Sequence, residues 1–135
     1  MSGMTSVLLD THILVWWFID PKSLTAVQRL RLEEGTPERP LAVITTTLWE
    51  VSMLHRRRRV DLGRPLRDWL DAATAAPLMR VLPITPAIAT EESQLPDTFH
   101  GDPADRLLVA TARVHHLPLI TSDARIRASG LVQVI

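Results

Sequence analysis

The sequence contains no cysteine, which excludes a disulfide framework and any zinc site built on thiolates. It also has no net charge: 15 Lys and Arg residues balance 15 Asp and Glu residues, so no overall positive field attracts nucleic acid. Lysine is almost absent, since Lys22 is the only one and the other basic residues are arginines. Arginine suits bidentate contacts with phosphate or carboxylate, although an excess of arginine can equally reflect genome composition.

Long apolar runs are missing as well. The most hydrophobic stretch, VLLDTHILVWWFI, is interrupted by Asp10 and His12 and is shorter than the roughly 20 apolar residues that cross a bilayer. The beginning of the sequence lacks the basic segment and the small-residue cleavage site of a secretory signal. We therefore expect a soluble protein of the cytoplasm that has no membrane partner.

The length and composition indicate one globular domain. A chain of 135 residues can bury about two thirds of the surface that its unfolded form exposes. Hydrophobic residues make up 46% of the sequence and charged residues 22%, which is ordinary for a globular protein. We expect a single domain over residues 1–135, without repeats or a second core.

Short apolar runs alternate with segments of helical periodicity along the chain. The expected strands cover residues 6–9, 41–45, 80–84, 117–123 and 131–135. The expected helices cover residues 11–19, 23–35 (with Ser23 as the cap), 46–59, 63–77, 86–93 and 103–115, and a short helix starts near residue 124. This alternation predicts an α/β fold, in which helices flank a mostly parallel central sheet.

Acidic residues follow several of the expected strands. Asp10 ends the first strand, Glu50 lies about one helical turn after the second, and Asp123 ends the fourth. Asp102 and Asp105 open the helix that leads to the fourth strand. Open parallel sheets place their functional groups at the carboxyl ends of the strands, so these five acids form the candidate site.

Helix capping offers each acid a purely structural explanation, because Asp is a favoured N-cap and acids in the first turn suit the helix dipole. Asp102 fits the N-cap of the helix that follows it, with Asp105 at position N3. Thr47 and Glu50 match the capping-box pattern T-x-x-E. The two acids that end strands suit the caps of the next helices.

Capping does not explain why acids gather at the same end of several parallel strands. Two carboxylates about 4 Å apart repel by roughly 4 kcal/mol at an effective dielectric constant of about 20, so at least one should protonate unless a cation is present. Mg²⁺ or Mn²⁺ removes this repulsion, keeps several waters and takes phosphate oxygens as further ligands. An acidic pocket with such an ion predicts a phosphodiester or phosphoryl site.

The segments that carry the acids resemble, in order and spacing, the acidic motifs of PIN-domain ribonucleases, and most closely those of VapC-type toxins from toxin–antitoxin pairs. The segments are LLDTHILVWW, TTLWEVSMLHR, HGDPADRLLVATA and LITSDARI, and together they span nearly the whole chain. The resemblance implies that Asp10, Glu50, Asp105 and Asp123 are the catalytic, metal-binding acids. It leaves the role of Asp102 open between helix cap and outer ligand.

From this resemblance we expect a PIN-like three-layer sandwich and a Mg²⁺- or Mn²⁺-dependent endoribonuclease, which uses metal-activated water and leaves a 5′-phosphate on the product. A homodimer and an antitoxin partner are also implied. The alternative is a non-catalytic PIN-like module that binds RNA or protein, but the acid losses that would indicate it are absent. A dehalogenase-type phosphatase is disfavoured because His12 replaces the second Asp of its D-x-D motif. A receiver domain is disfavoured because it needs a lysine after a late strand, whereas the only lysine of this sequence is Lys22.

A run of basic residues ends the helix that carries Glu50. It consists of Arg56, Arg57, Arg58 and Arg59. These residues suit three roles: a solvated helix end, a patch that contacts RNA phosphates, and a contact with acidic residues of the antitoxin. The sequence leaves all three open.

Other polar and aromatic residues near the motifs have weaker signals. Thr11, Thr121 and Ser122 stand beside acids, as candidate accessory groups that hydrogen-bond carboxylates, metal waters or phosphate, and local turn bonding is the equal alternative. The histidines, His100 among them, lack metal-ligand spacing, and we expect them to be structural. We expect Trp49 and Trp69 in the core.

Overall fold

The computed structural model describes residues 7–135, so Ser6 of the first expected strand lies outside the described residues. The strands are β1 (Val7–Leu9), β2 (Leu41–Ile44), β3 (Met79–Leu82) and β4 (Leu119–Ile120). The helices are α1 (Thr11–Ile19), α2 (Ala26–Glu33), α3 (Thr45–Arg56), α4 (Leu66–Ala73), α5 (Pro86–Gln94), α6 (Pro103–His115) and α7 (Ala124–Ser129), and a short 3-10 helix, η1 (Pro21–Ser23), follows α1.

The described strands form one parallel sheet in the order β3-β2-β1-β4. Leu8 of the central strand β1 pairs with Ala42 of β2 on one side and with Leu119 of β4 on the other. The chain adds β2 and β3 on one side of β1 and then crosses over to add β4 on the opposite side. The strand order therefore reverses between β1 and β4, which is where open α/β sheets bind their ligands.

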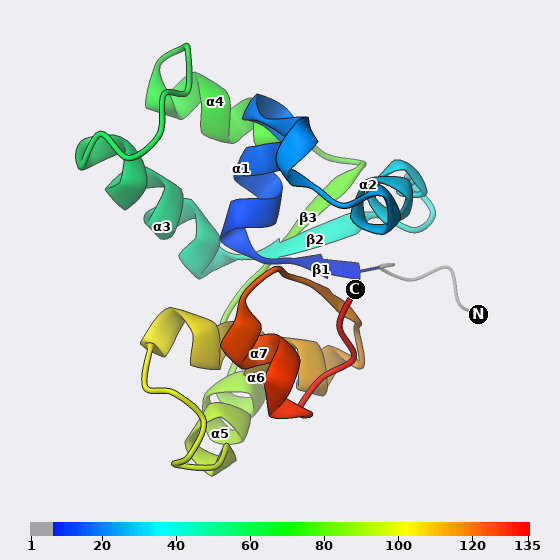
Figure 1. Cartoon of the computed structure of the whole chain (residues 1–135), viewed down its shortest axis with the longest axis vertical. Coiled ribbons are helices and arrows are strands. Elements are labelled where there is room, and N and C mark those ends of the chain that lie inside the picture. Colours follow the sequence, from blue (N-terminus) through cyan, green and yellow to red (C-terminus); the bar gives the residue numbers. More distant parts are fainter. Residues whose placement is uncertain (1–6) are drawn as a thin grey trace.

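Helices cover both faces of the sheet, with α1 to α4 on one face and α5 to α7 on the other (Figure 1). Side chains that alternate along the strands fill a separate core on each face. Val7 and Leu9 belong to the core beneath α1 to α4, whereas Leu8 belongs to the core beneath α5 to α7. The three-layer α/β architecture expected from the sequence is confirmed.

Several element boundaries differ from the expected ones for identifiable reasons. The cap of α2 is Thr25 and not Ser23: Thr25 Oγ1 accepts from the Gln28 N–H (3.0 Å), and Gln28 Oε1 accepts from the Thr25 N–H (3.1 Å). Strand β3 ends at Leu82 because Pro83 has no N–H for the ladder. Trp69 is buried, but Trp49 exposes 57% of its surface, so its expected place in the core was wrong.

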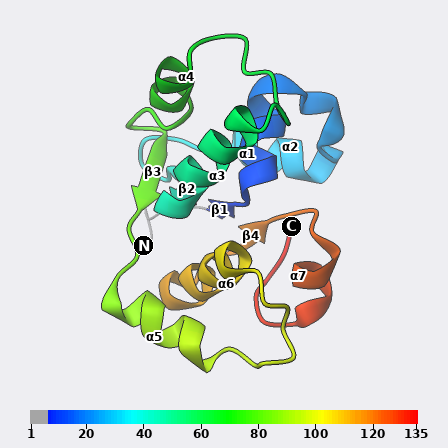
Figure 2. The same cartoon turned by 90° about the vertical axis from the view of Figure 1, so that its left-hand side faces the viewer.

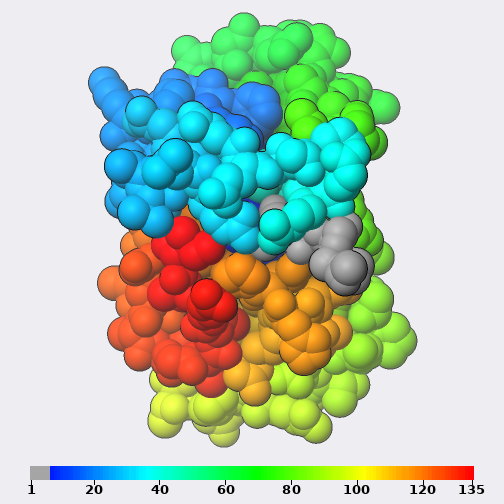
Figure 3. Space-filling view, turned by 90° about the vertical axis from the view of Figure 1, so that its right-hand side faces the viewer, coloured from blue at the N-terminus to red at the C-terminus, as the bar shows by residue number. Residues whose placement is uncertain are grey.

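The strand expected at residues 131–135 is reduced to an isolated parallel bridge between Leu119 and Val134. Side chains bind the end of this segment, since Gln28 Nε2 (3.3 Å) and an Arg127 guanidinium nitrogen (3.0 Å) both donate to the Ile135 carbonyl oxygen. These bonds hold the last residues beside the region of α2, where they lie in red next to light blue and cyan in Figure 3. No helix in the described range is both apolar and long enough to traverse a lipid bilayer.

Candidate functional site

The expected site residues come together at the carboxyl ends of β1, β2 and β4, the edge of the sheet that faces the viewer in Figure 2. Asp10 directly follows β1, and Asp123 lies just beyond β4. Helix α3 begins directly after β2 and carries Glu50, while α6 brings Asp105 from the other face of the sheet. Elements from both layers of helices therefore contribute to one site.

Asp10 occupies the N-cap position of α1, but its side chain makes no capping hydrogen bond. Its Oδ2 instead accepts a hydrogen bond of 2.7 Å from the Thr121 hydroxyl. The side chain is almost completely buried, and this burial raises the pKa of Asp10 against the opposing effect of the Thr121 hydrogen bond. The capping explanation therefore fails for this acid.

Glu50 does not complete a capping box either. Helix α3 starts at Thr45, so Thr47 lies inside the helix, where it is buried, and no side chain caps the helix. The Glu50 Oε1 atom accepts a hydrogen bond of 2.5 Å from the hydroxyl of Thr11, at the start of α1. Burial raises the pKa of Glu50, and the charges of Asp10 and Asp102 raise it further. Thr11 thus holds an acidic side chain of the site.

Asp102 and Asp105 differ in what their carboxylates contact. Asp102 caps α6, because its Oδ1 accepts from the Asp105 N–H at 3.1 Å. The carboxylate of Asp105 faces the other acids. Its pKa is raised to about 7, first by burial and then by the negative charges of the other four acids of the site, which are Asp10, Asp102, Asp123 and Glu50.

Asp123 combines a cap with a place in the cluster. Its Oδ1 accepts from the N–H groups of Arg125 (2.9 Å) and Ile126 (3.0 Å) at the start of α7. A carboxylate oxygen of Asp123, one of Asp105 and a ring nitrogen of His100 all lie within 4.8 Å of one another. One side chain therefore serves both helix α7 and the acidic site.

His100 is the residue that the strand-end argument missed. It lies in the loop before α6, and its Nε2 is 3.3 Å from Oδ2 of Asp105. The position of His100 inside the acidic segment HGDPADR could have indicated a place in the site, but the spacing of the histidines did not, and it was expected to be structural. Ser122, by contrast, accepts a hydrogen bond from Gln28 Nε2 (3.3 Å), a contact that connects it to α2.

The donor atoms of this site fit a hard divalent cation. Carboxylate oxygens of Asp105 and Asp123 lie within 4.8 Å of each other, and the charges of Asp10 and Glu50 act on Asp105. In the described part of the chain no Arg or Lys side chain forms an ion pair with any of the five acids. The repulsion that raises the pKa of Asp105 is therefore not relieved by an Arg or Lys side chain, and His100 is the one basic group found beside it in the described residues. A divalent ion bound by these oxygens would relieve it.

Part of the arginine run lines a hollow at the outer end of α3. Figure 1 shows that this end of the helix points away from the sheet. Arg56, Arg58, Arg59 and Arg64 are among the residues that line its volume of about 640 Å³. All of Arg56 to Arg59 are exposed, and none takes part in the ion pairs found in residues 7–135. Exposed guanidinium groups that could meet anions therefore line the hollow, together with the carboxylate of Asp61.

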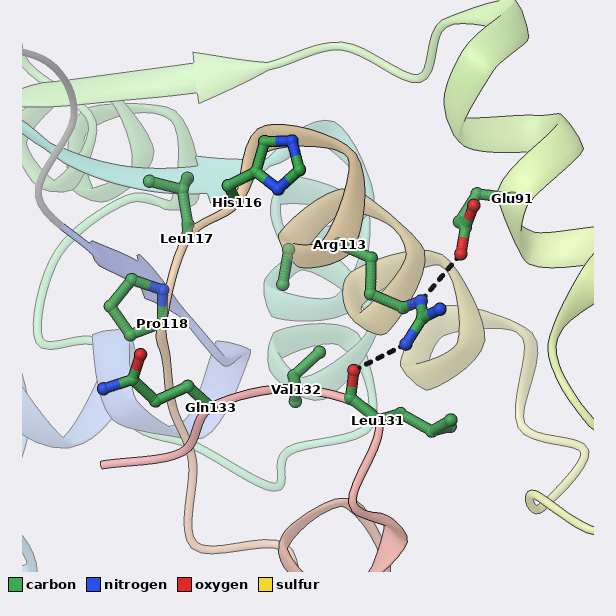
Figure 4. A pocket seen from close by; sticks show the side chains of 9 residues that line it. Glu91, Arg113, His116, Leu117, Pro118, Leu131, Val132 and Gln133 are labelled. Atoms are coloured by element: carbon green, nitrogen blue, oxygen red, sulfur yellow. Dashed lines mark hydrogen bonds and ion pairs between the residues drawn. The ribbon is translucent and has the colours of Figure 1, made fainter.

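A second hollow, of about 480 Å³, lies at the opposite, amino end of β4 (Figure 4). The Arg113 guanidinium on its wall bonds to the Glu91 carboxylate (2.6 Å) and to the Leu131 carbonyl oxygen (2.8 Å). Both charges are therefore paired within the protein. This hollow lacks the convergent acids of the site at the other end of the strands.

Two comparisons with known sequences give matches over most of the chain. The family model of the PIN domain matches residues 7–130. The chain is 38% identical over 125 residues to Ribonuclease VapC22 of Mycobacterium tuberculosis (strain ATCC 25618 / H37Rv), covering 93% of this chain and 92% of that protein.

Solved structures give the same result for the fold. VapBC2 from Rickettsia felis, bound to a DNA fragment from its promoter, contains a chain that matches with a TM-score of 0.73 at 12% identity, over 97% of this chain and 98% of that one. A toxin-antitoxin complex from Klebsiella pneumoniae matches with a TM-score of 0.66 at 25% identity, over 96% of each chain.

Proposed function

The chain belongs to the PIN-domain family as a ribonuclease of the VapC type, and we propose that it cleaves RNA internally with a divalent metal ion held by Asp10, Glu50, Asp105 and Asp123. The observation that carries this proposal is the environment of Asp105. Its carboxyl group is crowded by four other acids and pairs with no Arg or Lys side chain in residues 7–135, which is an arrangement suited to a cation. Mg²⁺ and Mn²⁺ both prefer such oxygen ligands.

The side chains around the acids set their positions for this reaction. Thr121 holds Asp10, and Thr11 holds Glu50, each through a hydroxyl that donates to the carboxylate. Asp102 caps α6 and so fixes the first turn, which carries Asp105. A bound divalent ion would neutralise the acids and activate water to attack a phosphodiester, so the product would carry a 5′-phosphate.

We propose that the hollow lined by Arg56, Arg58, Arg59 and Arg64 contacts phosphates of the same RNA. Arg56 follows Glu50 by six residues on α3, a separation of about 9 Å along the helix axis. A single strand cleaved at the acids would therefore pass within reach of these exposed guanidinium groups. Contact of the run with an acidic antitoxin segment is the competing outcome of the test described in the Discussion.

An antitoxin partner is proposed because a similar chain was solved in complex with an antitoxin. The Klebsiella pneumoniae structure, at 25% identity, is a toxin-antitoxin complex. We propose that this chain likewise binds a protein that blocks its acidic site, that it forms a homodimer, and that it acts in the cytoplasm as a single domain of residues 1–135. Ser122 stays a predicted accessory group.

The proposed function is tested by RNA cleavage with the purified full-length chain, free of any antitoxin. Cleavage is expected with Mg²⁺ or Mn²⁺ and should stop when EDTA is added. Equal cleavage under both conditions would contradict the metal-dependent reaction. RNA binding without cleavage under any metal condition would favour the non-catalytic module.

A further inference from the structure

The imidazole of His100 lies among the acids, and its ring nitrogens are buried without a hydrogen bond. Its Nε2 is 3.3 Å from Asp105 Oδ2, and its donor atom lies within 4.8 Å of both the Asp105 and the Asp123 oxygens. Both ring nitrogens are shielded from solvent, and neither makes a hydrogen bond within the described structure, so Nε2 approaches Asp105 at ion-pair distance without hydrogen-bond geometry. Buried polar atoms in native proteins nearly always have a partner, so a missing partner requires an explanation.

Packing alone does not provide that explanation. The His100 ring meets the ring of Phe99 edge to face, with centroids 4.7 Å apart, and this contact fixes the ring without bonding to its nitrogens. An apolar side chain would fill the same place at lower cost, because it has no polar atoms to desolvate. The Nε2 atom, which faces Asp105, therefore suits a partner that belongs to the site and lies between His100 and the acids.

We propose that His100 supplies a nitrogen ligand to the metal ion that Asp105 and Asp123 help to hold, an inference that rests on the proposed function. Ligand atoms about 2.0 to 2.2 Å from an ion lie about 3 Å apart when adjacent and just over 4 Å apart when opposite. The 3.3 Å between His100 Nε2 and Asp105 Oδ2 matches two adjacent ligands. The donor atoms of His100, Asp105 and Asp123 all lie within 4.8 Å of one another, so a small inward movement would bring them to the spacing of adjacent or opposite ligands.

A nitrogen ligand changes which ions the site prefers. Mg²⁺ favours oxygen ligands, whereas imidazole is a ligand of transition metals, whose affinities for nitrogen-containing sites exceed that of Mg²⁺. With His100 in the ligand set, the site binds Mn²⁺ more tightly than Mg²⁺. Replacing the imidazole by an amide, as in His100→Gln, lowers the Mn²⁺ affinity about tenfold or more and lowers the Mg²⁺ affinity less.

The decisive experiment is pulsed electron paramagnetic resonance of the full-length chain loaded with one equivalent of Mn²⁺, without RNA. Modulation of the electron spin echo by a directly bound ¹⁴N nucleus is expected, and labelling the histidines with ¹⁵N should change its pattern. His12→Gln is the matched control, because His12 is the histidine nearest Asp10 in sequence but lies on the exposed side of α1. The nitrogen signal should persist in His12→Gln and disappear in His100→Gln.

The outcomes separate this inference from the proposed function. Mn²⁺ that binds with oxygen ligands alone, while RNA is still cleaved, would overturn the role of His100 and leave the nuclease intact. A nitrogen signal that disappears in His12→Gln would also overturn it. If the chain binds no Mn²⁺ and cleaves no RNA, both proposals fail. The labelled wild-type chain and His12→Gln test the inference even if His100→Gln does not fold.

Discussion

The hydroxyl of Thr121 donates a 2.7 Å hydrogen bond to Oδ2 of Asp10, and this bond joins the ends of β4 and β1 across 111 residues of sequence. The same hydroxyl accepts a hydrogen bond of 3.0 Å from the N–H of Asp123. Thr121 is fully buried and lies where the strand order of the sheet reverses. One side chain thus holds two acids of the proposed site in a fixed relation.

Thr121→Val should therefore weaken both the fold and the site. Valine keeps the shape of threonine but cannot donate to Asp10, and hydrogen bonds to charged groups contribute about 1.5–3 kcal/mol to stability. We expect a loss of about that size in denaturant unfolding. Cleavage should fall about 10- to 100-fold, the usual effect of losing a group that orients a metal ligand.

Thr111→Val is the matched control for this substitution. Thr111 is equally buried, but its hydroxyl donates to the Leu107 carbonyl oxygen within α6. Cleavage by this variant should stay at the wild-type level. Equal losses of cleavage in both variants would show that the effect of Thr121→Val comes from the fold and not from Asp10.

The raised pKa of Asp105 predicts how stability without metal depends on pH. The folded chain holds the Asp105 proton up to a pKa of about 7, whereas an ordinary Asp loses it near 3.8, so folding is penalised increasingly as the pH rises from 4 to 7. Asp105→Asn lacks this penalty. Its advantage in melting temperature over the wild type in EDTA should grow from pH 5 to pH 7 and level off above pH 7.

Asp68→Asn, at an exposed position of α4, is the control for that measurement. Its melting temperature relative to the wild type should not follow the same course. An advantage of Asp105→Asn that is constant between pH 5 and pH 8 would contradict the raised pKa of Asp105.

The arginine run should act on RNA affinity and not on the chemical step. Replacing Arg56 to Arg59 by Gln should weaken RNA binding in EDTA and lower the slope of log affinity against log salt by about 0.7 for each lost phosphate contact. Arg67→Gln is the single-charge control, because Arg67 is exposed but already paired with Asp71. An unchanged slope combined with weaker antitoxin binding would assign the run to the antitoxin.

Most of the fold followed from local patterns in the sequence. The continuous apolar runs VLL and LAVI predicted buried parallel strands, and in the structure their successive side chains fill cores on opposite faces of the sheet. The start of α2 and the end of the chain were harder to predict, since both depend on Gln28. This residue completes the cap with Thr25 and also binds Ile135. The cap formed by Thr25 and Gln28 is local and matches the T-x-x-Q capping-box pattern, whereas the contact between Gln28 and Ile135 spans 107 residues and leaves no periodic signal.

The site divides in the same way. Strand ends and spacing pointed to the acids, because parallel strands bring their carboxyl ends to one edge. Sequence alone could not separate capping from ligation, since Asp102, Asp105 and Asp123 all stand where caps occur. His100 was missed because it lies in a loop and does not follow a strand, and its closeness to Asp105, five residues further on, depends on how the chain turns into α6.

The central claim is that Asp105 is a metal ligand and that Asp102, its neighbour across Pro103, is chiefly a cap. Asn replaces Asp well at an N-cap but lacks the charge that a hard cation requires, so the two Asp→Asn variants separate these roles. Asp102→Asn should keep cleavage within a few-fold of the wild type, because the amide oxygen can still accept from the Asp105 N–H.

The most direct measurement is the cleavage rate of Asp105→Asn together with its thermal melting, with and without Mg²⁺. Cleavage should fall by more than about 100-fold, since even outer-shell changes cost 10- to 100-fold. Mg²⁺ should raise the melting temperature of the wild type but not that of Asp105→Asn, while the metal-free variant stays at least as stable as the wild type. Full activity in Asp105→Asn, with an undiminished response to Mg²⁺, would contradict the account.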